Sequence, residues 1–541
     1  GRDLTLDSSA FETMAEMAHM LQLSSKDLAK GQVKLPAFRA LYLDGLFSGS
    51  EGVQVSRSKS FREMIRNFKS VSEGDYELPA GLDGILRPYQ KVGFQWLKTL
   101  AAYGFGDILA DEMGLGKTLQ MIAFLASLDP AERAGPSLVV CPASLILNWA
   151  DELDKFAPAL TYTLVMGSAG EREKQIACGG GKDVWVTSYE LLRQDIERYA
   201  PLRFACCILD EAQHIKNQST LVSKAVKRID CPQRFILTGT PIENRLSELW
   251  NLFDFLMPGY LFSHSAFVQK LEKPAIKSGS EEAMTKLQRM VQPFLLRRVK
   301  KEVLKELPPK IEYVRRISLS EDERKVYFAA SAAAKNSLTA GDNGKMAVFA
   351  ALTELRQICC APGLRFENYA GPSSKPDACI ELCAGMAENG HQILLFSQFT
   401  SMLDLIRARL DELGITHFTL QGSTPKEKRA QLVKAFNAGE ASVFLISLKA
   451  GGTGLNLTAA DTVILYDPWW NPAAQDQAVD RAHRIGQRSS VQVYKLIAKD
   501  TIEEKILKLQ SQKAALLDAV TASGESSILD MSKEELLALF E

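Results

Sequence analysis

Residues 108–120 read ILADEMGLGKTLQ, and this stretch predicts how the chain around it folds. A short apolar run at 107–110 leads into a glycine turn at 114–118, and an apolar-periodic helix pattern follows the turn. A strand, a glycine loop and a helix in this order are what a phosphate cradle needs. The glycines let backbone N–H groups approach phosphate oxygens, and the helix N-terminus adds its positive dipole end.

The glycine turn carries the side chains expected of a nucleotide site. Behind Gly114 and Gly116, Lys117 is placed to reach the β- and γ-phosphates of ATP, and the Thr118 hydroxyl is placed to hold Mg²⁺. The first glycine of the general G-x-x-x-x-G-K-T pattern is Asp111 here. A flexible surface loop would be a credible reading of GLGKT alone, but a second phosphate-site motif downstream argues against it.

The second motif is CCILDEAQH, at residues 206–214. Its first four residues predict a buried strand, so Asp210 and Glu211 follow at the carboxyl end, where open α/β sheets bind their ligands. Asp210 suits a contact to Mg²⁺, and Glu211 suits orienting and deprotonating the attacking water. An Asp-Glu pair after a strand also commonly caps the next helix. The phosphate loop earlier in the chain favours the catalytic interpretation.

Length and composition predict a large enzyme. At 541 residues the chain exceeds one core and suggests two or three domains, while 46% hydrophobic and 24% charged residues are ordinary for globular proteins. The sequence shows no membrane span and no signal peptide, and its Gly-Arg start predicts an excised fragment. The nine cysteines are unevenly spaced, as expected of a reducing compartment. Cys379 and Cys383 are expected to pack in the core rather than bind metal.

A net charge of -1 does not indicate a nucleic-acid binder, so any phosphate-binding surface must be local. The candidate is residues 295–310, where Arg297, Arg298, Lys300 and Lys301 cluster. The alternative is the solvated face of a helix that ends at the prolines 308 and 309.

Short apolar strands alternate with helices in two series, which predicts an α/β fold with two parallel sheets flanked by helices. Residues 257–391 are expected to be mostly helical, and residues 501–520 to form one long helix. The pattern assigns no chemistry to residues 1–80. The first series is expected at 107–110, 138–141, 184–187, 206–209 and 235–238, and the second at 393–396, 417–420, 443–447, 463–466 and 491–496.

The second half of the chain lacks a phosphate loop of its own, which predicts that it supplies charge to ATP bound by the first half. Gln477, Arg481 and Arg484 stand at i, i+4 and i+7 in QDQAVDRAHRIGQ and are expected to form one stripe along a helix. Two arginines on one face suit the transition state at the γ-phosphate. The alternative is a surface helix in which Asp476 or Asp480 pairs with the arginines.

Together these residues resemble the Swi/Snf-type ATPases, the double-stranded-DNA translocases of helicase superfamily two. The resemblance covers roughly residues 85–516 and implies two RecA-like lobes, at 81–310 and 311–541. Helical insertions are implied in both lobes (about 318–372 in the second), with a C-terminal bracing helix at about 501–520 and an N-terminal extension at 1–80. It implies a base contact by Gln90 in LRPYQ (86–90), with Gln477 also at the nucleotide. The implied DNA contacts are Ser144, Thr187, Ser188, Gln398, Lys449, Gly452, Thr453 and Asn456.

Some segments depart from the family pattern. Gln213 stands where the family usually has His, and it can still donate a hydrogen bond. Residues 360–361 are Cys-Ala where the family's remodellers typically show Asn-His. The insertions are compact and no chromatin-reading domain is present, which indicates a bacterial or archaeal member.

The resulting expectation is a DNA-stimulated ATPase that uses ATP and Mg²⁺ to move along duplex DNA without separating its strands. Its expected partners are double-stranded DNA and a DNA-bound protein, such as RNA polymerase, a repair protein or another roadblock. A monomer in the cytoplasm is expected, or in the nucleus if the source is eukaryotic, with no membrane partner. The alternatives are a strand-separating DNA or RNA helicase and a nonenzymatic nucleic-acid-binding scaffold.

Overall fold

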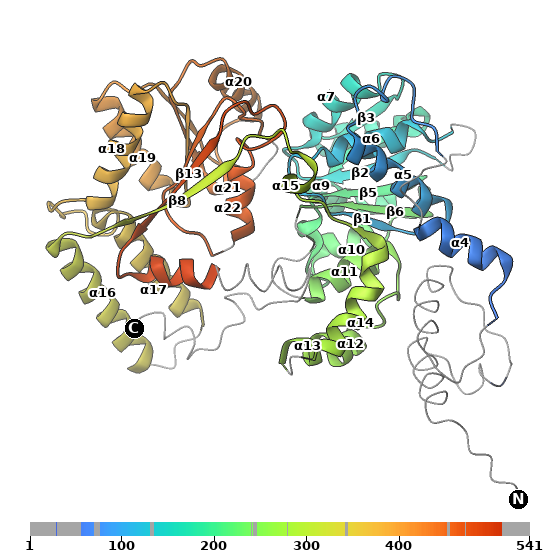
Figure 1. The fold of residues 1–541 in the computed structure, drawn as a ribbon, viewed down its shortest axis with the longest axis horizontal. Coiled ribbons are helices and arrows are strands. Elements are labelled where there is room, and N and C mark those ends of the chain that lie inside the picture. Colours follow the sequence, from blue (N-terminus) through green and yellow to red (C-terminus); the bar gives the residue numbers. More distant parts are fainter. Residues whose placement is uncertain are drawn as a thin grey trace, which may run out of the picture. The chain divides into compact units, whose positions relative to one another are not determined.

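The computed structural model describes residues 29, 56–69, 76–129, 135–239, 241, 246–277, 280–340, 345–451, 455–470 and 472–510. The chain separates into two compact units whose main division falls between Val299 and Lys300 (Figure 1). No helix among the described residues is long and apolar enough to cross a membrane.

The first unit is built on a sheet of seven parallel strands in the order β3-β4-β2-β5-β6-β1-β7. The central strands are short and mostly apolar, and β1, β2, β4 and β5 are buried along their whole length, because a parallel sheet is covered on both faces. The strands are β1 (Asp107–Leu109), β2 (Ser137–Cys141), β3 (Tyr162–Val165), β4 (Val184–Ser188), β5 (Cys206–Asp210), β6 (Gln233–Leu237) and β7 (Leu295–Leu296).

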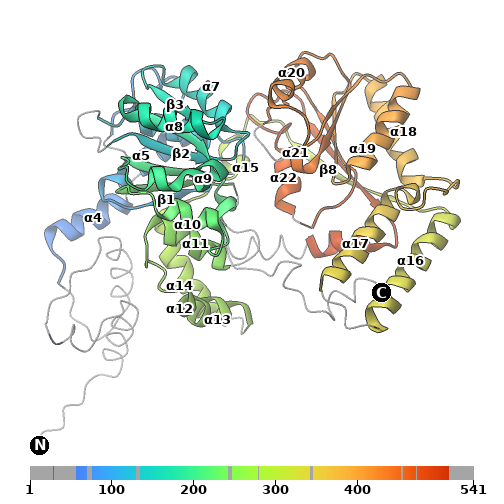
Figure 2. The same cartoon turned by 180° about the vertical axis from the view of Figure 1, so that it is seen from behind.

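Helices flank this sheet on both faces (Figures 1 and 2). Apolar residues of these helices, α4 excepted, join those of the strands in one core, which includes Trp149 of α7 and Phe253 of α11. The helices are α4 (Lys59–Lys69), α5 (Pro88–Ala102), α6 (Lys117–Ala126), α7 (Ile146–Phe156), α8 (Ala169–Cys178), α9 (Tyr189–Tyr199), α10 (Leu221–Lys227), α11 (Leu246–Leu256), α12 (His264–Phe267), α13 (Lys273–Lys277) and α14 (Glu281–Val291).

The second unit has a sheet of six parallel strands in the order β10-β11-β9-β12-β13-β8. Successive residues of β9 alternate between two cores: Ile393 and Leu395 pack on one face, and Leu394 and Phe396 on the other. This alternation requires a helical layer on each face. The strands are β8 (Lys310–Ile317), β9 (Ile393–Ser397), β10 (His417–Leu420), β11 (Val443–Ser447), β12 (Thr462–Leu465) and β13 (Val491–Ala498).

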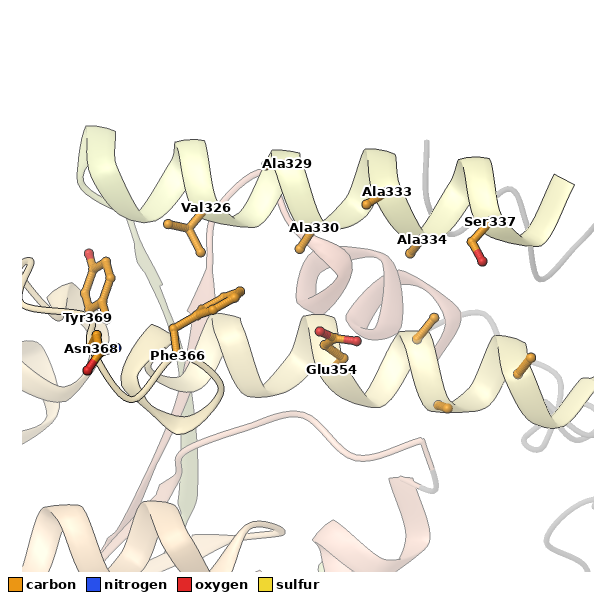
Figure 3. Close-up of a pocket in the computed structure, with 13 residues that line it drawn as sticks. Val326, Ala329, Ala330, Ala333, Ala334, Ser337, Glu354, Phe366, Asn368 and Tyr369 are labelled. Atoms are coloured by element: carbon orange, nitrogen blue, oxygen red, sulfur yellow. The ribbon is translucent and has the colours of Figure 1, made fainter. Parts of the chain in front are cut away.

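The helices of the second unit include a long pair, α16 and α17, which shares a separate core with Ile502 and Ile506. Alanines of both helices line a hollow of about 990 Å³, with Phe366 and Tyr369 at one end (Figure 3). The helices are α15 (Lys300–Val303), α16 (Glu321–Ala340), α17 (Lys345–Cys360), α18 (Ser374–Glu388), α19 (Thr400–Glu412), α20 (Lys426–Asn437), α21 (Leu448–Gly451) and α22 (Pro472–Val479).

The α/β class with two parallel sheets and helical insertions is confirmed, but three strands had no prediction. β3 and β8 lie at sheet edges, and β7 is only two residues long. The region expected to be mostly helical, residues 257–391, is mostly helical, but it also contains β8, for which there was no prediction. The β8 sequence KIEYVRRI is exposed at most positions, so it lacks the buried apolar run that marks the central strands. Its pairing with β13 places it in the sheet.

Two predicted segments fall partly or wholly outside the described residues. Of the helix expected at 501–520, residues 502–510 are helical and the remainder is not described. Of residues 1–80, the structure describes 29, 56–69 and 76–80, including α4. The lobe boundary expected at 310–311 stays a prediction, and the compact units divide about ten residues earlier.

Candidate nucleotide site

Strand register brings the two predicted phosphate-site motifs to one edge of the first sheet. Leu237 of β6 lies opposite Leu109 of β1 on one side and opposite Asp210 of β5 on the other. All three strands are parallel, so their carboxyl ends share the edge where α/β sheets bind ligands. Two motifs roughly ninety residues apart in sequence therefore meet here.

The glycine turn has the backbone geometry of a phosphate loop. Gly114 and Gly116 have φ of 89° and 76°, the left-handed region that side chains disfavour, and Gly116 is the N-cap of α6. A Cβ on Gly116 would lie 2.4 Å from Nε2 of Gln90, the predicted base contact. Gly116 is therefore required both for the turn and for the close approach of Gln90, which is itself buried.

Lys117 lies at the start of α6, beside both motifs. Its Nζ donates to the backbone oxygen of Asp111 at 2.8 Å, and its ammonium partly offsets the burial that raises the pKa of Asp210. The predicted phosphate-binding lysine and the predicted metal-binding carboxylate are thus close enough to interact electrostatically. Anionic phosphate oxygens with Mg²⁺ fit between such a pair.

Asp210 is held by two side chains that the sequence did not single out for this role. The Trp149 indole Nε1 donates to its Oδ2 at 2.9 Å, and the Tyr189 hydroxyl donates to its backbone oxygen at 2.8 Å. Burial and, next, the charge of Glu211 raise the pKa of Asp210 to about 7. A divalent cation would offset both the burial of Asp210 and its repulsion from Glu211. The Asp210 carboxylate and the Thr118 hydroxyl are oxygen donors, which suit Mg²⁺.

Substituting Trp149 by Phe is expected to weaken the response to Mg²⁺. Phenylalanine keeps the ring in the core but removes the N–H that orients the Asp210 carboxylate. Loss of such an outer partner typically costs about 10- to 100-fold in metal affinity. The measurement is the Mg²⁺ concentration that gives half-maximal ATP hydrolysis, together with nucleotide binding with and without Mg²⁺.

Trp185→Phe is the matched control for this prediction. Trp185 is equally buried in the same unit, and its Nε1 donates to the backbone oxygen of Gly179 at 3.0 Å. An equal Mg²⁺ shift in both variants would show that Trp149 acts only through packing.

Glu211 adopts a backbone conformation that costs energy. Its φ is 52° and its ψ is 57°, unusual for a residue with a Cβ, and such strain concentrates at functional sites. Gln213 Nε2 donates to its Oε2 at 2.9 Å. Gln213 thus donates the hydrogen bond expected of it to the Glu211 carboxylate, which is predicted to position the attacking water.

The basic cluster at 295–310 is divided between internal ion pairs and exposed side chains. Its role as a phosphate-binding surface stays a prediction, and the alternative of one helix ending at the prolines is wrong. Arg298 pairs with Asp111, and Lys300 pairs with Asp480 at 2.6 Å while also donating to the His483 backbone oxygen. Of the four basic residues, Arg297 and Lys301 are exposed. Instead of one long helix, the segment forms β7 and the four-residue α15.

The predicted arginine stripe is not on one helix. α22 ends at Val479, so Gln477 is helical whereas Arg481 and Arg484 follow in turns. Arg481 is buried, with 1% of its surface exposed, and Arg484 is half-buried. The alternative of a solvated helix face is equally inconsistent with this burial. Asp480 pairs with Lys300.

The predicted DNA contacts in the first unit differ in accessibility. Ser144 is half-buried in the turn before α7. Thr187 is fully buried and donates to the Val165 backbone oxygen at 3.0 Å, while buried Ser188 caps α9 by accepting from Leu191. The last two hydroxyls have partners inside the unit, which argues against direct DNA contact by these side chains.

In the second unit, Gln398 is tied to a buried ion pair. Its backbone N donates to Asp467 Oδ1 at 3.1 Å, and Asp467 Oδ2 pairs with Arg356 at 3.3 Å. Arg356 also lies over the ring of Trp470 at 5.6 Å, so this tryptophan packs against the ion pair of its own unit.

The remaining predicted contacts follow β11 in the sequence. Asn456 is exposed. Lys449 belongs to α21, and Gly452 and Thr453 lie outside the described residues.

Two other features were considered as sites, the cysteine pair and the hollow between α16 and α17. Cys379 and Cys383 are buried in a hydrophobic core, as expected. Within the described ranges, no group of three His, Cys, Asp or Glu residues is placed to hold a metal ion. The hollow between α16 and α17 is lined by none of the residues predicted to bind nucleotide or DNA.

Family comparisons agree with the site. Residues 89–364 match the SNF2-related domain, and residues 374–486 match the helicase conserved C-terminal domain. The chain belongs to the SNF2 family. Its sheets are therefore the two RecA-like lobes expected from the resemblance. Residues 1–79 match the family described as bacterial SNF2 helicase associated, in agreement with a bacterial or archaeal member.

Curated relatives cover most of this chain. It is 40% identical to an uncharacterized ATP-dependent helicase of Mycoplasma genitalium, over 87% of the chain and 46% of the relative. It is 39% identical to the putative ATP-dependent helicase/translocase YwqA of Bacillus subtilis, over 91% and 55%. It is 36% identical to the human TATA-binding protein-associated factor 172, over 90% and 30%. The chain thus spans about half the length of the bacterial relatives, and less of the human one.

Solved structures include a similar protein from Sulfolobus solfataricus, described as a SWI2/SNF2 ATPase core in complex with dsDNA. The chain is 37% identical to it, with 86% of this chain and 98% of that chain covered and a TM-score of 0.42.

Proposed function

We propose that this chain hydrolyses ATP to ADP and phosphate and uses the energy to move along duplex DNA without separating its strands. The observation that carries the proposal is the meeting of Lys117, Asp210 and Glu211 at one sheet edge of an SNF2-family chain. This is the set needed to bind phosphates, hold Mg²⁺ and position water.

In this proposal the first unit binds the nucleotide and the second completes the catalytic site. Gln90 contacts the base, and Lys117 and Thr118 bind phosphate and Mg²⁺. Arg481 and Arg484 act on the γ-phosphate when the lobes close on DNA. Gln477 contacts the nucleotide from the same segment.

The proposed contacts are made to the sugar-phosphate backbone of DNA. The two lobes bind and release this backbone in turn, which moves the chain along the duplex. Ser144, Gln398, Lys449 and Asn456 are the described candidates. Phosphate contacts do not distinguish between base sequences, so the chain would move along DNA of any sequence. The movement would displace a DNA-bound protein, such as RNA polymerase, a repair protein or another roadblock. In support, one curated relative is named TATA-binding protein-associated factor 172.

The deciding experiment is the ATP hydrolysis rate with duplex DNA, single-stranded DNA and RNA, run beside a strand-separation assay. Stimulation by duplex DNA without strand separation supports translocation. Stimulation by single strands with unwinding indicates a helicase instead, and nucleic-acid binding without hydrolysis indicates a scaffold.

DNA binding is expected to weaken steeply with salt and to be nearly indifferent to sequence. Several phosphate contacts release counterions, and a protein with about 6–10 of them loses roughly 10³–10⁵ in affinity between 50 and 200 mM salt. The measurement is the dissociation constant for several unrelated duplexes across a salt series. A flat salt response, or strong preference for one sequence, would contradict backbone tracking.

A further inference from the structure

A buried ion pair joins the phosphate loop to the end of the first unit. Arg298 Nε lies 2.8 Å from Asp111 Oδ1, and its Nη2 lies 2.5 Å from Asp111 Oδ2, so both carboxylate oxygens are engaged. The Asp111 side chain is fully buried and that of Arg298 is 11% exposed. Two-point contacts of this kind fix orientation as well as distance.

Arg298 also reaches two other elements around the loop. Its Nη1 donates to the backbone oxygen of Tyr89, and its guanidinium lies 5.2 Å from the centre of the Tyr89 ring. Its Nη2 donates to Gln120 Oε1 at 2.7 Å, and Gln120 Nε2 donates to Asp111 Oδ2 at 3.1 Å. One guanidinium thus contacts the start of α5, the strand end before the glycine turn, and α6.

The backbone around Arg298 adds to this connection. The Arg298 oxygen accepts from the Glu112 N–H at 2.9 Å, and the Leu296 oxygen accepts from the Ala110 N–H at 2.7 Å. The residues just before the glycine turn are therefore held along their length by the segment that ends the first unit.

The side chains of Gln120 and Arg298 fill the space beside Gly93 of α5. A Cβ on Gly93 of α5 would lie 1.9 Å from Gln120 Oε1 and 2.9 Å from Arg298 Nη2. Asp111 stands where the general phosphate-loop pattern has glycine. Here its carboxylate anchors Arg298, and Lys117 binds its backbone oxygen.

We propose that Arg298 is a positioning residue that holds the phosphate loop against the base-reading segment, with Asp111 as its anchor. The inference rests on the proposed ATP site and assigns these two residues to it. Arg298 touches no reacting atom. It acts by keeping Gln90, one residue after Tyr89, and Lys117 at a fixed spacing, so both ends of ATP are bound together.

The test compares Arg298→Met, the double variant Asp111→Asn/Arg298→Met, and the control Arg297→Met. Removing Arg298 alone leaves the buried Asp111 carboxylate without its charged partner and destabilises the fold. Removing both charges of a buried pair is often tolerated. Arg297 is the adjacent, exposed arginine. The measurements on the whole chain are the melting temperature, titration with a fluorescent ATP analogue, and the KM and kcat of ATP hydrolysis.

The double variant is expected to melt near the unaltered chain but to bind the ATP analogue about 10- to 100-fold more weakly, since small misplacements in a binding site cost on this order. KM should rise more than kcat falls, because saturating ATP restores the loop geometry. Arg297→Met should change neither.

Unaltered ATP affinity and KM in a folded double variant would overturn this inference while leaving the proposed function intact. Failure of the unaltered chain to bind the ATP analogue would instead overturn the proposed function, and this inference with it. A purely structural role predicts that ATP affinity recovers together with the melting temperature in the double variant.

Discussion

Glu211→Gln is expected to bind ATP normally and to lose about 10²–10⁴ in turnover, the range typical of general-base catalysis. Glutamine has the same shape and its side-chain oxygen can still accept the Gln213 hydrogen bond, so the side chain at this position keeps its partner. It cannot take a proton from water. Single-turnover hydrolysis with DNA present, measured beside equilibrium ATP binding, separates the two effects.

Two further variants are needed to interpret the turnover of Glu211→Gln. Glu197→Gln is the matched control, because Glu197 is an exposed carboxylate of the same unit that pairs with Arg228. Lys117→Ala should instead lose both binding and hydrolysis, since a charge-assisted phosphate contact disappears. Near-normal turnover in Glu211→Gln would show that another group activates the water.

Arg484→Ala is expected to lose roughly 10³–10⁵ in turnover, the typical contribution of an arginine at a phosphoryl transition state. ATP affinity should fall far less, because the contact is made mainly in the closed, transition-state geometry. Arg484 is half-buried, so a modest loss of stability is expected. DNA-stimulated hydrolysis and ATP-analogue binding, measured on the same preparation, check both parts.

Arg481 requires a different experiment. A solvated arginine would be replaceable by Ala at little cost, but Arg481 is buried, and Ala would leave a cavity. Arg481→Met fills more of that volume, and its turnover must be read beside its melting temperature. Arg488→Ala is the control for both arginines, because Arg488 is exposed in the same segment. Full activity in Arg484→Ala combined with Arg481→Met would refute the role assigned to the second lobe.

The sequence alone predicted the phosphate loop and the carboxylates of the first unit. These depend on local patterns: an apolar run, a glycine turn, a helix, and acidic residues directly after a strand. The order of such elements along the chain also predicted parallel sheets, because parallel strands require crossover helices. Edge strand β8 was not predicted because most of its residues are exposed and its sequence has no apolar run.

Pairings between distant residues were decided only by the tertiary structure. Arg298 stands 187 residues from Asp111, and Asp210 stands 61 residues from Trp149. The sequence pattern around a charged residue does not show whether that residue is surrounded by water or by a buried partner. The basic cluster and the arginine segment were therefore expected to face solvent or a ligand. Burial is set by which elements pack together, and no local spacing encodes that.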